Sequence, residues 1–214
     1  MATTVEKTIT EFRGCRDLVA APVTKNTDQE LTFGEVRPLA GLAELSRDIT
    51  VNSKTSFYDD VASNTSTSEG EDKITAKISA LSLENLAWIT GRTYDADLDA
   101  LGEGPIEPPL IAIGYKTGET GSDGENSRYV WRYCCKCALP SESYKTKDDS
   151  ADTNGQELII TSIYPNKAIA FKGETKKWKA LVVGTRGNAD LTTFFDTVTL
   201  PDALTAKADA QAEG

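Results

Sequence analysis

The run RYVWRYCCKCALP at residues 128–140 decides the fold, because its side chains alternate at a two-residue period. Aromatic and β-branched residues at this period are typical of a β-strand, in which successive side chains point to opposite faces of the sheet. One face is predicted to carry Tyr129, Trp131, Tyr133, Cys135 and Cys137, and the other face Val130, Arg132, Cys134, Lys136 and Ala138.

The three cysteines of this strand raise the alternative of a metal site. Cys134 and Cys135 are predicted on opposite faces, so they cannot share a tetrahedral ion without breaking the strand. Cys135 and Cys137 share a face, but a zinc site needs two more ligands and only Cys15 remains. We therefore interpret these cysteines as small buried hydrophobic residues and expect no metal.

Similar β-prone runs recur along the chain, with turn residues between them. They lie at residues 31–39, 42–50, 55–61, 72–81, 110–117, 156–165 and 176–183. Short strands without long helices between them favour an antiparallel β-sandwich or barrel. With 214 residues the chain can bury one sizeable core, and the long polar connections are expected on its surface.

Two segments follow a helical period instead. In SLENLAWITG (82–91), apolar residues recur at helical spacing after Ser82, a plausible N-cap, and Gly91 stands where a helix would stop. In ADLTTFFDTVTLP (189–201), a similar stripe begins after Asp190 and ends at Pro201. The expected fold is therefore mainly β, with one or two short flanking α-helices and long loops.

The charge and the residue types exclude several classes of function. The net charge of −10, from 33 acidic and 23 basic residues, argues against a protein that grips a nucleic-acid backbone. The chain has no histidine, which removes the Ser-His-Asp and Cys-His nucleophile systems and most zinc and iron sites. We expect a protein that is not an enzyme, with no catalytic residues and no cofactor. No signal-peptide core or membrane-length apolar run is evident, so a cytosol with reduced thiols is expected.

An acidic loop at residues 93–109 offers a candidate calcium site. Its acids are Asp95, Asp97, Asp99, Glu103 and Glu107. Three of them alternate as at the start of an EF-hand loop, but Ala100 stands at the turn glycine and Ile106 at the closing acid. We interpret the loop as a local negative surface rather than a calcium site.

Several segments, in this order, resemble the major tail proteins of long-tailed, non-contractile bacteriophages, the subunits of the tail tube. They are GCRDLVAAPVTKN (14–26), LTFGEVRPLAGLAELS (31–46), SLENLAWITGRTYD (82–95), YVWRY (129–133), TNGQELIITSI (153–163) and ADLTTFFDTVTLP (189–201). The resemblance covers residues 14–201, so we divide the chain into an N-terminal arm (1–13), a tail-tube β-sandwich domain (14–201) and a polar C-terminal tail (202–214).

The resemblance implies a virion protein, assembled in the bacterial cytoplasm, whose subunits form hexameric rings by joining sheets edge to edge. The rings would stack into a hollow tube around a tape-measure protein, bounded by a tail terminator and a distal tail or baseplate protein. Viral DNA would pass through the lumen without specific binding during genome ejection, and the subunit would not insert into a membrane itself. An acidic lumen suits such passage, because carboxylates repel phosphate.

Contact between rings is assigned, as a hypothesis, to the polar excursion at residues 52–72. Phe57 and Tyr58 would be its apolar anchors, next to Asp59 and Asp60. The alternative, that Phe57 and Tyr58 are core residues of a strand, is equally compatible with the sequence.

Other classes of function also fit a β-sandwich. A carbohydrate-binding or adhesive decoration module on a virion would use Tyr58, Tyr94 and Tyr144 as sugar platforms. An enzyme with two carboxylates at fixed separation would need a cleft that the sequence does not reveal. The tube of a secretion or contractile injection machine shares the fold, and a domesticated prophage product is a further alternative.

Overall fold

The computed structural model describes residues 10–58, 61–121, 124–142 and 155–207. These residues form a mainly β structure in which the main sheet has nine strands. Seven of them follow the order β2-β1-β8-β9-β10-β5-β4, all the pairings are antiparallel, and β13 and β3 are added beside β9 and β1. The expected mainly β, antiparallel fold is confirmed, although the sheet does not close into a barrel among these residues.

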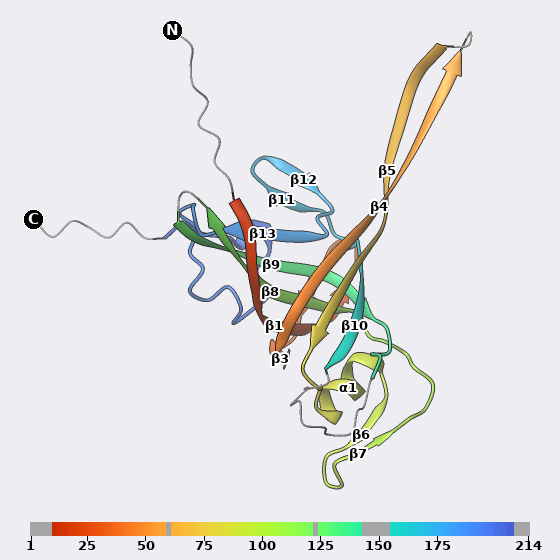
Figure 1. Cartoon of the computed structure of the whole chain (residues 1–214), viewed down its shortest axis with the longest axis vertical. Coiled ribbons are helices and arrows are strands. Elements are labelled where there is room, and N and C mark those ends of the chain that lie inside the picture. The colour runs from red at the N-terminus through yellow and green to blue at the C-terminus, as the bar shows by residue number, and fades with distance from the viewer. Residues whose placement is uncertain (1–9, 59–60, 122–123, 143–154, 208–214) are drawn as a thin grey trace, which may run out of the picture.

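Their bounds are β1 Thr10–Asn26, β2 Leu31–Phe33, β3 Arg37–Ala40, β4 Leu42–Tyr58, β5 Val61–Ile78, β8 Ile111–Gly121, β9 Gly124–Cys137, β10 Gln156–Ile163 and β13 Ala180–Gly184. Two small hairpins stand apart from this sheet: β6 Thr93–Asp95 with β7 Ala100–Gly102, and β11 Ile169–Phe171 with β12 Glu174–Lys176. In Figure 1 the β4–β5 hairpin runs far beyond the body, and β6 and β7 lie at the opposite end of the long axis.

Strand β9 connects two parts of the sheet. Its first half pairs with β13 and its second half with β10, while β8 runs along most of its length. Between Arg132 and Cys135 the register against β8 shifts by one residue, which is a β-bulge. The bulge falls where β9 changes partner.

This bulge corrects the predicted alternation. Trp131 and Tyr133 pack in one core cluster together with Cys134, whereas Cys135 and Cys137 pack in the other. The prediction that Tyr133 and Cys135 share a face is therefore wrong, because the extra residue reverses the parity after Tyr133. Cys134 and Cys135 do face opposite sides, as expected, and all three cysteines of this strand are buried and free of disulfides.

The two clusters lie on opposite faces of the central strands. The first is built on apolar residues of β5, β8 and β10 and is capped by helix α1, Leu83–Thr90. Ser82 accepts a hydrogen bond from the N–H of Asn85, and Gly91 ends the helix at φ 70°. A Cβ at Gly91 would stand 2.1 Å from the Glu107 carbonyl oxygen, so only glycine fits this turn. The predicted first helix is confirmed.

The second predicted helix is wrong. Residues 192–198 form turns, and their side chains cover the second core cluster, around Phe194. The carbonyl of Phe194 accepts hydrogen bonds from the indole N–H of Trp131 at 2.8 Å and from the hydroxyl of Thr199. In an α-helix this carbonyl would accept from the backbone N–H four residues later. The backbone hydrogen bonds of this segment instead join residues three apart, as turns do. A short 3₁₀ turn, η1 Pro201–Ala203, follows.

Candidate interaction surfaces

The distal half of the β4–β5 hairpin is exposed on both faces. Nearly every described side chain between residues 50 and 69 is exposed, including Val51 (61%), Phe57 (66%) and Val61 (63%). Phe57 is therefore not a core residue. Tyr58 ends β4, but its side chain lies outside the described residues, as do Asp59 and Asp60. The candidate anchor that the structure does place, Phe57, lies one residue before the end of β4. Figure 1 shows that the tip of the β4–β5 hairpin lies far from the body.

The root of the hairpin is held to the body by a buried carboxylate. Asp72 of β5 has no exposed surface and accepts two hydrogen bonds of 2.7 Å from the Arg47 guanidinium of β4. Arg132 of β9, itself buried, donates to the same carboxylate at 3.3 Å and to the hydroxyl of Tyr115 at 3.1 Å. Burial alone would raise the pKa of Asp72, but the hydrogen bond from Arg47 and the two guanidinium charges hold it below its ordinary value.

A second contact ties the hairpin to the segment before β13. The carboxylate of Glu69 accepts a hydrogen bond of 2.7 Å from the hydroxyl of Tyr164 and one of 3.0 Å from the ammonium of Lys179. These hydrogen bonds, that from Tyr164 first, lower the pKa of Glu69. The Lys179 ammonium also lies 4.4 Å from the centre of the Tyr164 ring. The hairpin therefore leaves the body at an angle fixed by two ionic contacts.

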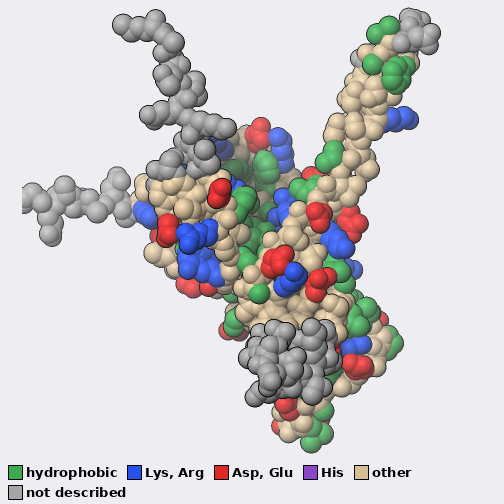
Figure 2. Space-filling view, viewed as in Figure 1, with side chains coloured by type: hydrophobic (Ala, Val, Ile, Leu, Met, Phe, Trp, Pro, Cys, Tyr) green, Lys and Arg blue, Asp and Glu red, His purple; other side chains and the backbone are tan. Residues whose placement is uncertain are grey.

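Between the hairpin and the body lies a hollow made of two adjoining cavities of about 500 and 360 Å³. Arg47, Arg132 and Val182 line both of them. We call this space the cationic hollow, because its basic lining residues outnumber Glu44 and Glu69. The basic residues are Arg47, Arg128, Arg132, Lys176, Lys177 and Lys179. Figure 2 shows hydrophobic, basic and acidic side chains together where the hairpin leaves the body.

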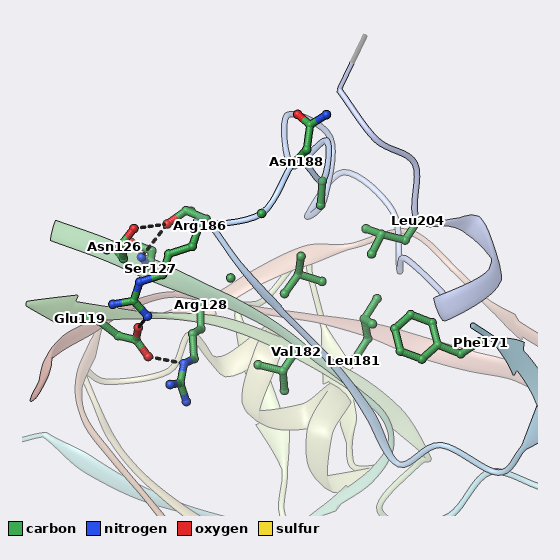
Figure 3. Close-up of a pocket in the computed structure, with 15 residues that line it drawn as sticks. Glu119, Asn126, Ser127, Arg128, Phe171, Leu181, Val182, Arg186, Asn188 and Leu204 are labelled. Carbon is green, nitrogen blue, oxygen red and sulfur yellow. Dashed lines mark hydrogen bonds and ion pairs between the residues drawn. The ribbon is translucent and has the colours of Figure 1, made fainter. Parts of the chain in front are cut away.

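A third cavity, of about 380 Å³, lies along β13 and is lined by its residues from Leu181 to Gly184. Figure 3 shows Leu181, Phe171 and Leu204 on its apolar side and an ionic cluster at its opposite end. In that cluster the buried carboxylate of Glu119 pairs with the guanidinium groups of Arg128 and Arg186, the latter at 3.1 Å.

The structure places the predicted acidic loop on and beside the β6–β7 hairpin. Asp95 caps the turn by accepting hydrogen bonds from the N–H groups of Asp97 and Leu98, and Asp99 accepts one from the Tyr94 hydroxyl. Glu103 pairs with Arg92 at 3.4 Å, and the backbone of Glu107 bonds to the last turn of α1. The five acids are thus spread along the loop.

Within the described ranges, no three histidine, cysteine or acidic side chains converge as metal ligands would. Of the three tyrosines proposed as sugar platforms, only the side chain of Tyr94 belongs to the described part, and it is half-buried against Asp99. Tyr144 lies outside that part. No helix among the described residues has the length and apolar character needed to cross a membrane.

Sequence reasoning missed the ionic root of the hairpin, although signals for it exist. Asp72 lies on the same face of β5 as the buried Ile74, Ala76 and Ile78, so a carboxylate continues an otherwise apolar face. Arg132 likewise interrupts the aromatic strand. Buried charges are rarely left unpaired, so each of them predicts a partner of opposite charge.

The chain matches no protein-family model and no curated protein.

Proposed function

We propose that this chain is the structural subunit of a bacteriophage tail tube. Its subunits would form hexameric rings that stack into a hollow tube through which viral DNA leaves the virion. The observation that carries this proposal is the β4–β5 hairpin, whose distal half exposes apolar side chains that the subunit itself does not cover.

The physical argument is that such a hairpin needs a partner. From Val51 to Tyr58 it extends roughly 25 Å, at about 3.3 Å per residue. A two-stranded ribbon is marginally stable in water without a third strand or a packed face. Exposed Phe57 and Val61 near its tip have the composition of an interface anchor. A stacked neighbouring subunit would supply the missing surface.

Open sheet edges give a second support. In the described strands, β2 and β4 end the strand order, so each leaves backbone groups of one edge free of sheet partners. Uncovered edges invite pairing with another chain, and a heterologous contact that closes by rotation gives a ring. The resemblance of residues 14–201 to tail-tube subunits adds the ring of six, the tape-measure protein, the tail terminator and the distal tail or baseplate protein as proposed partners. The proposed location is the tail of the virion.

The proposal is tested by replacing the hairpin anchors. Phe57→Ser with Tyr58→Ser is expected to leave a folded subunit, because the exposed Phe57 contributes nothing to the core, but to abolish assembly into tubes. Leu139→Ser, which removes an exposed apolar side chain from outside the hairpin, is the matched control and is expected to assemble normally. Circular dichroism checks folding and negative-stain electron microscopy counts tubes. Normal tubes from the double variant would refute the role of the hairpin.

A further inference from the structure

The cationic hollow contains a sheet face that the subunit covers only in part. Val182 of β13 points into it and is 53% exposed, and Phe12 of β1, also on its lining, is 70% exposed. Deeper in the hollow, Val130 and Tyr115 of the same face are almost fully buried. The face loses its cover where the β4–β5 hairpin diverges from β1 (Figure 1). An apolar face rimmed by charged residues is typical of an interaction surface.

The rim of the hollow selects an acidic occupant. Lys176 and Lys177 are exposed along its edge, and the ammonium of Lys176 is paired with Glu174 at 2.7 Å. Arg47 and Arg132 line its floor, where they share the single carboxylate of Asp72. An occupant is therefore expected to bring an apolar group to Val182 and a carboxylate to Lys177.

The turn of the β6–β7 hairpin has this chemistry. Leu98 is 75% exposed, the most exposed of the large hydrophobic residues in the described part of the chain, and it stands between the carboxylates of Asp97 and Asp99. Its turn is held by the hydrogen bonds to Asp95 and by that from Tyr94 to Asp99, so little further ordering is needed on binding.

The two surfaces face opposite ends of the molecule. The residues that line the hollow come from the root of the β4–β5 hairpin and the strands beside it, whereas Figure 1 shows β6 and β7 at the end of the long axis opposite the hairpin tip. A subunit cannot fill its own hollow with its own β6–β7 turn in this arrangement. A contact between two different patches is heterologous, and it repeats from copy to copy to form a ring or a filament.

We propose that the β6–β7 turn of one subunit docks in the cationic hollow of a second copy of the chain, with Leu98 against Val182 and Asp97 beside Lys177. The contact rests on the proposed function in that a copy in the next ring would supply the partner. It adds a head-to-tail contact to that of the β4–β5 hairpin.

A charge exchange tests this contact in the full-length chain. Asp97→Lys or Lys177→Glu alone turns one attraction into repulsion, and each is expected to weaken self-association about tenfold. Asp97→Lys combined with Lys177→Glu in one chain restores the attraction with the charges exchanged, and is expected to return association to within about twofold of the unmodified chain. Leu98→Ser is expected to weaken association at every salt concentration. Asp28→Lys and Lys136→Glu make the same charge changes at exposed positions elsewhere and serve as controls.

Sedimentation velocity gives the association constant, and electron microscopy of the same samples gives the form of the assembly. Recovery in the exchanged double variant supports the contact, whether the assembly is a tube or a short oligomer; a short oligomer without tubes would overturn the tail-tube function alone. Tubes that form equally well from both single variants would overturn the docking contact and leave the function standing. A chain that is monomeric at every concentration would also overturn the contact. So would binding of the polyanion heparin in the hollow, if Asp97→Lys left self-association unchanged.

Discussion

Replacing Asp72 by asparagine is the perturbation that the structure makes most specific. Asp72→Asn keeps the shape of the side chain but removes the charge that Arg47 and Arg132 share. Two hydrogen bonds of 2.7 Å from Arg47 and one of 3.3 Å from Arg132 converge on this fully buried carboxylate. The variant leaves the two guanidinium groups facing each other without a counterion.

The expected loss is about 3 kcal/mol in the free energy of unfolding. Removing one partner of a buried ion pair costs about 3–5 kcal/mol, and the lower figure applies because Arg47 is partly exposed and can be solvated. For a chain of this length, that loss corresponds to a decrease in Tm of roughly 6–12 °C.

The same variant should change the dependence of stability on acid pH. The pKa of Asp72 is lower in the folded chain than in the unfolded one, so its contribution is complete above the unfolded value of about 4. The contribution is lost as the pH falls through the folded pKa. The difference in stability between the unmodified chain and Asp72→Asn should therefore be largest near neutral pH and shrink below about pH 4.

Urea unfolding followed by tryptophan fluorescence, at protein concentrations too low for assembly, measures both effects. Asp48→Asn is the matched control, because Asp48 is an exposed acid of β4 near the same root. A loss of less than about 1 kcal/mol for Asp72→Asn, or a difference that stays constant down to pH 3, would refute the stabilising role of this ion cluster.

The remaining predictions concern the helix end and the thiols. Gly91→Ala should lower the free energy of unfolding by about 1–3 kcal/mol, because Gly91 has a positive φ and a Cβ there would collide with the Glu107 carbonyl. Gly104→Ala is the control and should change this free energy little, because no atom lies near its Cβ. Equal free energies of unfolding for the two variants, measured in urea, would contradict the prediction. In the native chain Cys15 should be the thiol that reacts readily with Ellman's reagent. Burial raises the pKa of Cys134 to about 11 and that of Cys137 to about 12, and it shields Cys135. Two or more fast-reacting thiols would contradict the buried placement.

Periodicity predicted several strands and the first helix correctly, but it did not indicate β1 at Thr10–Asn26. Ile74, Ala76 and Ile78 are buried on one face of β5 as their spacing indicates, and Ser82 and Gly91 bound α1. The errors have local causes that a period does not reveal. A single bulge in β9 reverses the faces after Tyr133, and tertiary hydrogen bonds to Phe194 replace a helix with turns.

The interaction surfaces were predictable only in part. The polarity of residues 52–72 indicated a projecting excursion, but not that its strands continue unbroken from the core as β4 and β5. The cationic hollow could not be predicted, because Arg47, Arg132 and Val182, which line both of its cavities, come from segments far apart in the sequence. Their meeting depends on the strand order, which a single sequence does not encode as a pattern.

The most direct test of the proposed function is negative-stain electron microscopy of the purified, concentrated chain at near-neutral pH. We expect long tubes of stacked rings with a stain-filled bore, or discrete rings if stacking needs an initiator. Uniform small particles at every concentration would contradict the tail-tube function.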